Sequence, residues 1–200
     1  MVRLCLNLAS GDDPKVSTSE EKWINIDLYD TSLANKPDYN WERQDVIRYL
    51  SECESNTIDE IYSKWFFEHV SFLDEKSLWE NCYRVLKPHG KINIYVPDFE
   101  YLCKLFLNAT DEFKDFYKLC PKSDSKYGFG HGNDTNFEGG RWGTMISHFY
   151  GNQAADGQFH KTAYTAGRIY DIMVHVGFCN VIVTEIMERG ILNLDAIGYK

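Results

Sequence analysis

Short apolar runs separated by polar turns recur along the chain. The first run, Leu4–Ala9, breaks at Ser10 and Gly11, and the second run, Trp23–Leu28, carries Asp27 near its end. Apolar runs of about four to eight residues between turn residues are typical of buried strands. The same pattern predicts further strands around Asp45–Leu50 and over Thr57–Ser63 and Lys91–Val96.

Apolar residues at helical spacing run from Glu75 to Leu86, and the pattern ends at Pro88 and Gly90, which do not continue a helix. The remaining predicted elements are a helix-rich region over about 100–119, a helix over Thr165–Val176 ended by Gly177, and strands over Val181–Ile186 and Leu192–Tyr199.

Strands that alternate with helices predict an α/β fold with a doubly wound, Rossmann-like and mostly parallel sheet of seven strands. We expect the last two strands to form an antiparallel hairpin. Only the stretch Ser10–Lys22 separates the first two strands, so the first connecting helix is expected to be short or irregular. Residues 1–200 are predicted to form one domain, with 99–160 as an acceptor-binding insertion; the chain is either a minimal fold or one domain of a longer polypeptide.

Composition narrows the choice of partners. The chain has 30 acidic and 21 basic residues and a net charge of −9, which disfavours nucleic acid as the main partner. No apolar run approaches the roughly 18 residues of a membrane span. The six cysteines are scattered without a CxxC or zinc-site spacing, which is typical of reduced cysteines in a cytoplasmic protein.

The glycine turn after the first strand and the acidic end of the second predict a nucleoside site. Gly11 lets the backbone approach a ligand closely, and the Asp27 carboxylate is suited to accept hydrogen bonds from both ribose hydroxyls. The alternatives are an ordinary turn at Gly11 and a helix N-cap at Asp27. A dinucleotide site requires Gly-x-Gly-x-x-Gly, which this turn lacks.

Several motifs carry a family resemblance. They are Leu6-Asn7-Leu8-Ala9-Ser10-Gly11, Trp23-Ile24-Asn25-Ile26-Asp27, Ile58-Asp59-Glu60-Ile61-Tyr62-Ser63, Phe67-Glu68-His69-Val70 and Arg84-Val85-Leu86-Lys87-Pro88-His89-Gly90-Lys91. Over most of the chain they resemble the small class I S-adenosylmethionine-dependent methyltransferases, most closely the subgroup associated with polysaccharide and glycan biosynthesis. The sequence departs from the family pattern where Ala9 and Asp13 replace two glycines and where Leu50-Ser51-Glu52 replaces Leu-Pro-Phe.

The resemblance implies S-adenosyl-L-methionine as the cofactor, with S-adenosyl-L-homocysteine as its product. The residues that it implies for cofactor binding are Ala9, Ser10, Gly11, Asp27, Leu28, Asp45 and Ser63. Asp45 matches the family's acidic residue near the adenine.

The acceptor is expected to meet a lid over 127–160, where aromatic residues are interleaved with His, Asn and Asp. Such a mixture suits a sugar, although the aromatics could instead pack the lid onto the sheet. The predicted general bases are His148 and His160, with Asp98 orienting one of them. The predicted substrate-binding residues are Lys64, Trp65, His69, His131, Trp142 and Tyr150. Glu68 and His69 are expected to act mainly as supporting polar groups, and no carboxylate spacing predicts a metal site.

The sequence thus predicts a methyltransferase that acts on a sugar hydroxyl of a glycan, with a deoxyhexose such as rhamnose as the suggested acceptor. The substrate class rests on the subgroup resemblance. Two alternatives stay open: methylation of a small metabolite or protein side chain, and a degenerate methyltransferase fold that serves as a binding module.

Overall fold

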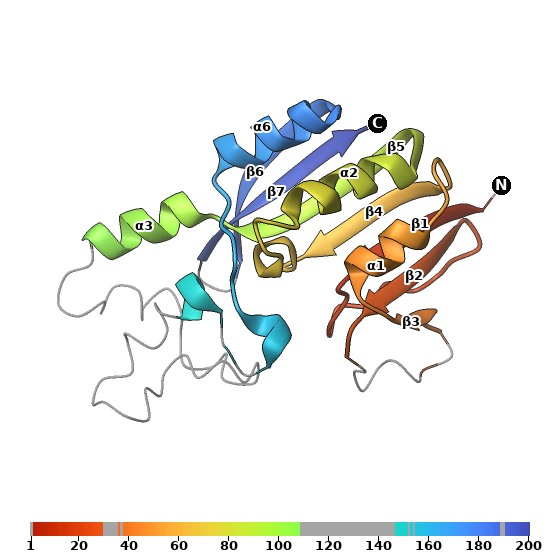
Figure 1. Ribbon diagram of the computed structural model, residues 1–200, viewed down its shortest axis with the longest axis horizontal. Helices are drawn as coiled ribbons and strands as arrows, with labels where there is room; N and C mark the ends of the chain where they lie inside the picture. The colour runs from red at the N-terminus through yellow and green to blue at the C-terminus, as the bar shows by residue number, and fades with distance from the viewer. Residues whose placement is uncertain are drawn as a thin grey trace.

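A computed structural model describes residues 2–29, 36, 38–108, 147–151, 153, 155–188 and 191–200. One seven-stranded sheet organises them, in the order β3-β2-β1-β4-β5-β7-β6 (Figure 1). The strands are β1 (Arg3–Leu8), β2 (Glu21–Asp27), β3 (Trp41–Arg43), β4 (Ile58–Lys64), β5 (Leu86–Pro97), β6 (Cys179–Glu188) and β7 (Ile191–Tyr199). β1 to β5 pair in parallel, whereas β7 is antiparallel to both β5 and β6. The predicted fold class, including the C-terminal hairpin, is confirmed.

The helices of the described residues are α1 (Val46–Glu52), α2 (Glu75–Val85), α3 (Phe99–Asn108) and α6 (Ala166–Val176), with 3-10 turns η1 (Phe67–His69) and η3 (Asp156–Gln158). Three of these four helices, α1, α2 and α6, lie side by side on one face of the sheet (Figure 1). α2 lies between α1 and α6, and α3 extends away from the sheet (Figure 1). The predicted helix over Thr165–Val176 is confirmed as α6. Its boundaries are set by the Thr165 side chain, which caps its start, and by Gly177, which ends it with φ 117°.

The two faces of the sheet differ in chemistry because side chains alternate along each strand. Leu6 of β1 and Ile61 of β4 lie side by side, fully buried, in the apolar core beneath the helices. Their neighbours Asn7 and Tyr62 are also paired in register and point to the other face. The central strands therefore present an apolar face to the helices and a polar face to the opposite side.

The connection from β1 to β2 corrects one expectation, since residues 9–20 contain no helix. Two buried asparagines hold this connection instead. Asn7 Nδ2 donates to the Asp13 carbonyl at 2.9 Å. Asn25 Oδ1 accepts from Lys15 N at 2.7 Å, and Asn25 Nδ2 donates to the Lys15 carbonyl at 2.9 Å. Side-chain amides thus supply the partners that a helix would give to its own backbone.

The strand predicted around Asp45–Leu50 is wrong. This segment forms α1, in which Val46 and Leu50 bury the same face four residues apart, and the actual third strand is the three-residue β3. In the predicted helix-rich region over 100–119, α3 ends at Asn108, and residues 109–146 lie outside the described part of the chain.

Two broader observations concern the described residues. None of their helices is long and apolar enough to cross a membrane.

The five cysteines of the described residues are free thiols, and burial raises the pKa of Cys5 to about 12.

Candidate functional site

Two residues in the turn after β1 have left-handed backbone conformations. Ala9 has φ 50° and Gly11 has φ 47°. Between them, Ser10 N donates to the Ile26 carbonyl at 3.1 Å, and Asp13 N donates back to the Ser10 carbonyl at 2.8 Å. The turn is therefore fixed to β2 at the carboxyl end of the parallel strands, where open α/β sheets bind ligands.

Asp27 links this turn to the end of β2. Its Oδ2 accepts from Gly11 N at 2.9 Å, and its Oδ1 accepts from Tyr29 N at 2.9 Å. A carboxylate offers about four lone-pair sites, so each oxygen retains capacity for a further donor. The half-buried carboxylate can therefore hold the glycine turn and bind a pair of ribose hydroxyls at once.

The groups around Asp27 also suit a bound nucleoside. A Cβ atom built on Gly11 would meet nothing nearer than the Ala9 carbonyl at 4.0 Å, so the backbone is open to a ligand. Ser10 Oγ is buried, and no group among the described residues hydrogen-bonds it. Leu28 lies next to Asp27 with 47% of its surface exposed, which provides apolar contact area. These residues fit the predicted cofactor.

Two of the predicted cofactor residues have local structural roles. The exposed Asp45 caps α1, because its Oδ1 accepts from Arg48 N at 2.9 Å. Ser63 is fully buried, and its Oγ donates to the Leu8 carbonyl at 3.2 Å, which braces the end of β1. Contact of either side chain with a cofactor stays a prediction.

Lys64 and Trp65, at the end of β4, are tied to the C-terminal hairpin. Lys64 Nζ forms an ion pair with Glu188 at 2.6 Å and lies 4.6 Å from the centre of the Trp65 ring. Trp65 Nε1 donates to Asn193 Oδ1 at 2.9 Å. The hairpin thus fixes both residues at the carboxyl edge of the sheet, and their predicted contact with substrate is untested.

Asp98, like Asp45, has a local structural role. Its Oδ1 accepts from the backbone N–H groups of Glu100 and Tyr101, at 2.9 and 3.3 Å, so it caps the start of α3. Burial raises the pKa of this carboxyl. Among the described residues its side-chain hydrogen bonds go to these amides, and the expectation that it orients a histidine stays a prediction.

Three of the predicted histidines assemble beside η1. His160 Nδ1 lies 3.0 Å from the His148 carbonyl, and the rings of His69 and His160 meet edge to face at 4.8 Å. Burial lowers the pKa of His69 to about 4 and also lowers that of His160. Both imidazoles are therefore neutral at pH 7, as proton acceptors must be.

His148 and His160 also line a small pocket. Its walls include Glu68, Pro97, Phe99, Leu102, His148, Phe149, His160, Thr162, Ala163 and Tyr164. Glu68 is the residue that sequence reasoning undervalued: it is 3% exposed, and burial raises its pKa to about 8. The sequence signal for Glu68 was its place in Phe67-Glu68-His69-Val70, one of the motifs that carry the family resemblance. Tyr150 is 57% exposed and meets His160 through its backbone, whereas His131 and Trp142 lie outside the described residues.

Comparison with protein families gives a match over part of the chain. A family model described as a methyltransferase domain matches residues 16–94, a span that includes Asp27 and ends in β5. The sequence matches no curated protein.

Solved structures of S-adenosylmethionine-dependent methyltransferases share the fold. One from Archaeoglobus fulgidus has a TM-score of 0.58 at 14% identity, and the alignment covers 100% of this chain and 86% of that one. The 1,6-didemethyltoxoflavin-N1-methyltransferase of Burkholderia thailandensis has a TM-score of 0.58 at 12% identity, over 100% of this chain and 71% of that one. The CurJ carbon methyltransferase has a TM-score of 0.55 at 12% identity, and the alignment covers 99% of this chain and 48% of that one. These comparisons show that the chain has the fold of S-adenosylmethionine-dependent methyltransferases.

Proposed function

We propose that the chain transfers a methyl group from S-adenosyl-L-methionine to a sugar hydroxyl of a glycan, with a deoxyhexose as the acceptor. The observation that carries the cofactor assignment is the 2.9 Å hydrogen bond from Gly11 N to Asp27 Oδ2. It joins the glycine turn to the acidic strand end, so the backbone that would approach the cofactor and the carboxylate that would bind its ribose form one unit.

The chemistry required of the protein is limited. Bound S-adenosylmethionine supplies an activated methyl group, so the chain has to position the acceptor and remove its proton. A hydroxyl has a pKa far above 7, and a neutral histidine is suited to accept the proton as the new bond forms. His148 and His160 are the proposed bases, since both line the pocket beside η1.

The acceptor class is supported by the surroundings of these histidines. Phe99 and Phe149 lie edge to face, with ring centroids 5.6 Å apart, and Tyr150 lies next to Phe149 at 6.5 Å. Aromatic rings beside polar groups suit a ligand with an apolar C–H face and hydroxyls. The glycan itself is proposed on the resemblance of the sequence to the polysaccharide-associated subgroup.

The cofactor assignment is tested by titrating the chain with S-adenosylhomocysteine in a calorimeter. We expect Asp27→Ala to weaken binding by more than about tenfold, since a charge-assisted hydrogen bond contributes about 1.5–3 kcal/mol. Asp171→Ala is the matched control, because it removes a carboxylate from an exposed position on α6. Equal affinity of the wild type and Asp27→Ala would sink the assignment.

The acceptor is tested by transfer of labelled methyl to a panel of glycosides, small metabolites and peptides. We expect methylated deoxyhexosides, with turnover reduced about 100-fold or more in a variant that lacks the base. Undiminished turnover in both His148→Ala and His160→Ala would rule out the proposed bases, and labelling of another class alone would replace the glycan assignment.

A further inference from the structure

Three potential metal ligands from distant parts of the chain meet beside η1. Glu68 and His69 belong to this turn, whereas His160 follows η3. Backbone hydrogen bonds bring the two segments together, because Lys161 N and Thr162 N both donate to the Glu68 carbonyl, at 2.7 and 3.2 Å. One ligand atom from each of Glu68, His69 and His160 lies within 4.8 Å of the other two.

The hydrogen bonds of the two rings define their tautomers. His69 Nδ1 lies 3.2 Å from the Phe159 carbonyl, and His160 Nδ1 lies 3.0 Å from the His148 carbonyl. A carbonyl oxygen can only accept, so both Nδ1 atoms carry the proton and both Nε2 atoms carry a lone pair. Histidines that bind metals usually donate their second nitrogen in this way, which fixes the ring.

The third member, Glu68, can supply a negative charge once it loses its proton to a bound cation's demand for a carboxylate ligand. Glu68 is 3% exposed, and no group among the described residues hydrogen-bonds its Oε2. A buried, charged carboxylate oxygen without a partner is unfavourable, and this cost is removed by a proton or by a cation.

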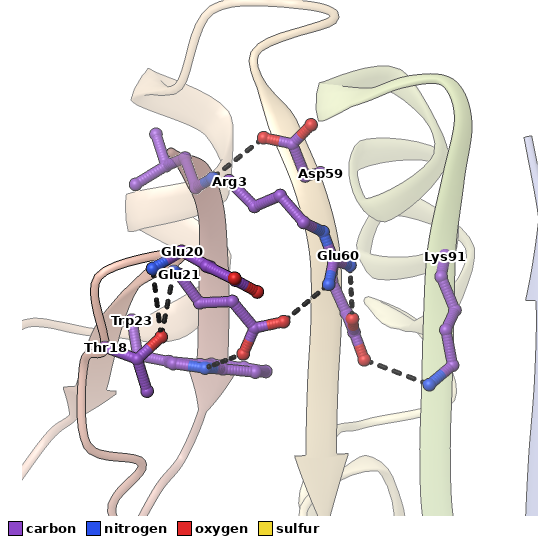
Figure 2. Close-up of polar contacts among 9 residues, drawn as sticks. Arg3, Thr18, Glu20, Glu21, Trp23, Asp59, Glu60 and Lys91 are labelled. Carbon is purple, nitrogen blue, oxygen red and sulfur yellow. Dashed lines mark hydrogen bonds and ion pairs between the residues drawn. The ribbon is translucent and has the colours of Figure 1, made fainter. Parts of the chain in front are cut away.

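A second cluster in the sheet shows the contrast. Cys5, Glu21 and Glu60 also approach one another closely, on the polar face of the sheet. Figure 2 shows that their carboxylates already have cationic partners: Arg3 pairs with Glu21 at 2.5 Å and with Glu60 at 2.6 Å, and Lys91 pairs with Glu60 at 3.0 Å. That cluster is internally neutralised and offers little to a metal.

We propose that Glu68, His69 and His160 bind one Zn²⁺ or a similar first-row divalent cation. Two imidazole nitrogens and one carboxylate oxygen form a donor set that suits zinc, whereas Mg²⁺ and Ca²⁺ prefer oxygen ligands throughout. The site is argued from side-chain geometry alone and does not depend on the proposed methyl transfer. It would fasten the segment around His160 to the end of β4, and it would leave His148 as the base of the proposed reaction.

The test uses the full chain after treatment with a chelator and dialysis. We expect calorimetry to show one equivalent of Zn²⁺ bound, with a higher midpoint of thermal unfolding. Mg²⁺ at the same concentration should have no effect. Glu68→Gln and His160→Gln should each weaken Zn²⁺ binding by more than about 100-fold, beyond the loss typical of outer-shell changes. His175→Gln, at an exposed histidine of α6, is the matched control.

Co²⁺ gives an independent readout. Its visible spectrum reports the ligands directly, so we expect absorption bands in the wild type that change in His160→Gln and stay the same in His175→Gln. Glu68→Gln keeps the shape of the side chain and removes its capacity for a negative charge. Failure of the wild type to bind Zn²⁺, or equal binding by both variants and the wild type, would overturn the proposal and assign a proton to the cluster. If Glu68→Gln does not fold, His69→Gln and His160→Gln provide the same comparison.

Discussion

At the scale of single residues, Asn25 carries much of the connection between β1 and β2. Its side chain is fully buried and bonds both backbone groups of Lys15, while its Nδ2 also approaches the Asn40 carbonyl at 3.3 Å. The residues beyond Lys15 reach β2 without a helix, so the shape of the cofactor turn depends on this amide.

We expect Asn25→Ala to lower the free energy of unfolding by about 2 kcal/mol, because it leaves buried backbone groups of the loop unpaired. It should also weaken binding of S-adenosylhomocysteine, since the loop that carries Gly11 is released. Urea unfolding and calorimetry measure the two effects. Asn81→Ala, at an asparagine of α2 that bonds within its own helix, should change stability by less than about 0.5 kcal/mol. Equal stability of both variants would show that the loop does not need Asn25.

At the scale of elements, the sequence predicted most of the sheet because its strands are apolar runs between turn residues. Gly177 and Thr165 likewise marked the ends of α6. The failures have physical causes. β3 has only three residues, too few for a pattern, and a seven-residue helix such as α1 buries so few positions that its apolar spacing also fits a strand.

The candidate site was predictable only where its chemistry is local. Gly11 and Asp27 follow predicted strands, so their position at one edge of the sheet could be inferred from strand order. The meeting of Glu68 with His160 depends on the path of the chain after α3, which no spacing in the sequence encodes. Asp98 illustrates a further ambiguity, because an acidic residue after a strand can also serve as a helix cap, and here it caps α3.

The packing of α2 against α6 leads to a prediction at this scale. Glu75 of α2 accepts from Arg168 of α6 at 2.6 and 2.9 Å and from the hydroxyl of Tyr164 at 2.5 Å. Glu75→Ala leaves the buried hydroxyl and the guanidinium without this partner, so we expect a loss of about 3 kcal/mol in the free energy of unfolding.

Glu80→Ala on the same helix is the control, because Glu80 forms only an exposed pair with Lys76 at 3.7 Å. Its effect should stay below about 1 kcal/mol. A double-mutant cycle between Glu75 and Arg168 isolates the pair, and a coupling energy near zero would contradict this account of how α2 and α6 are joined.

At the scale of the whole molecule, the two ends of the parallel strands carry different groups of residues. The candidate cofactor turn and the histidine cluster lie at or beyond their carboxyl ends. The network of Arg3, Glu21, Glu60 and Lys91 lies toward the amino ends of these strands, across β2, β1, β4 and β5 (Figure 2). This division predicts that the network contributes to stability and not to ligand binding.

We expect Arg3→Gln to lower the free energy of unfolding by about 1 kcal/mol, a modest value because 43% of the Arg3 side chain is exposed. Lys22→Gln is the matched control, since it removes the same charge from an exposed neighbouring position on β2. The chain has a net charge of −9, so each variant removes a positive charge that is attracted to the excess of negative charge. Only Arg3→Gln also breaks two ion pairs. The difference in unfolding free energy between the two variants should shrink as salt is raised to about 1 M, where charges are screened beyond roughly 3 Å.

Chemical unfolding at two salt concentrations measures this difference, and S-adenosylhomocysteine titration should give the same affinity for both variants. A loss of affinity in Arg3→Gln alone would mean that the two ends of the strands are coupled through the sheet.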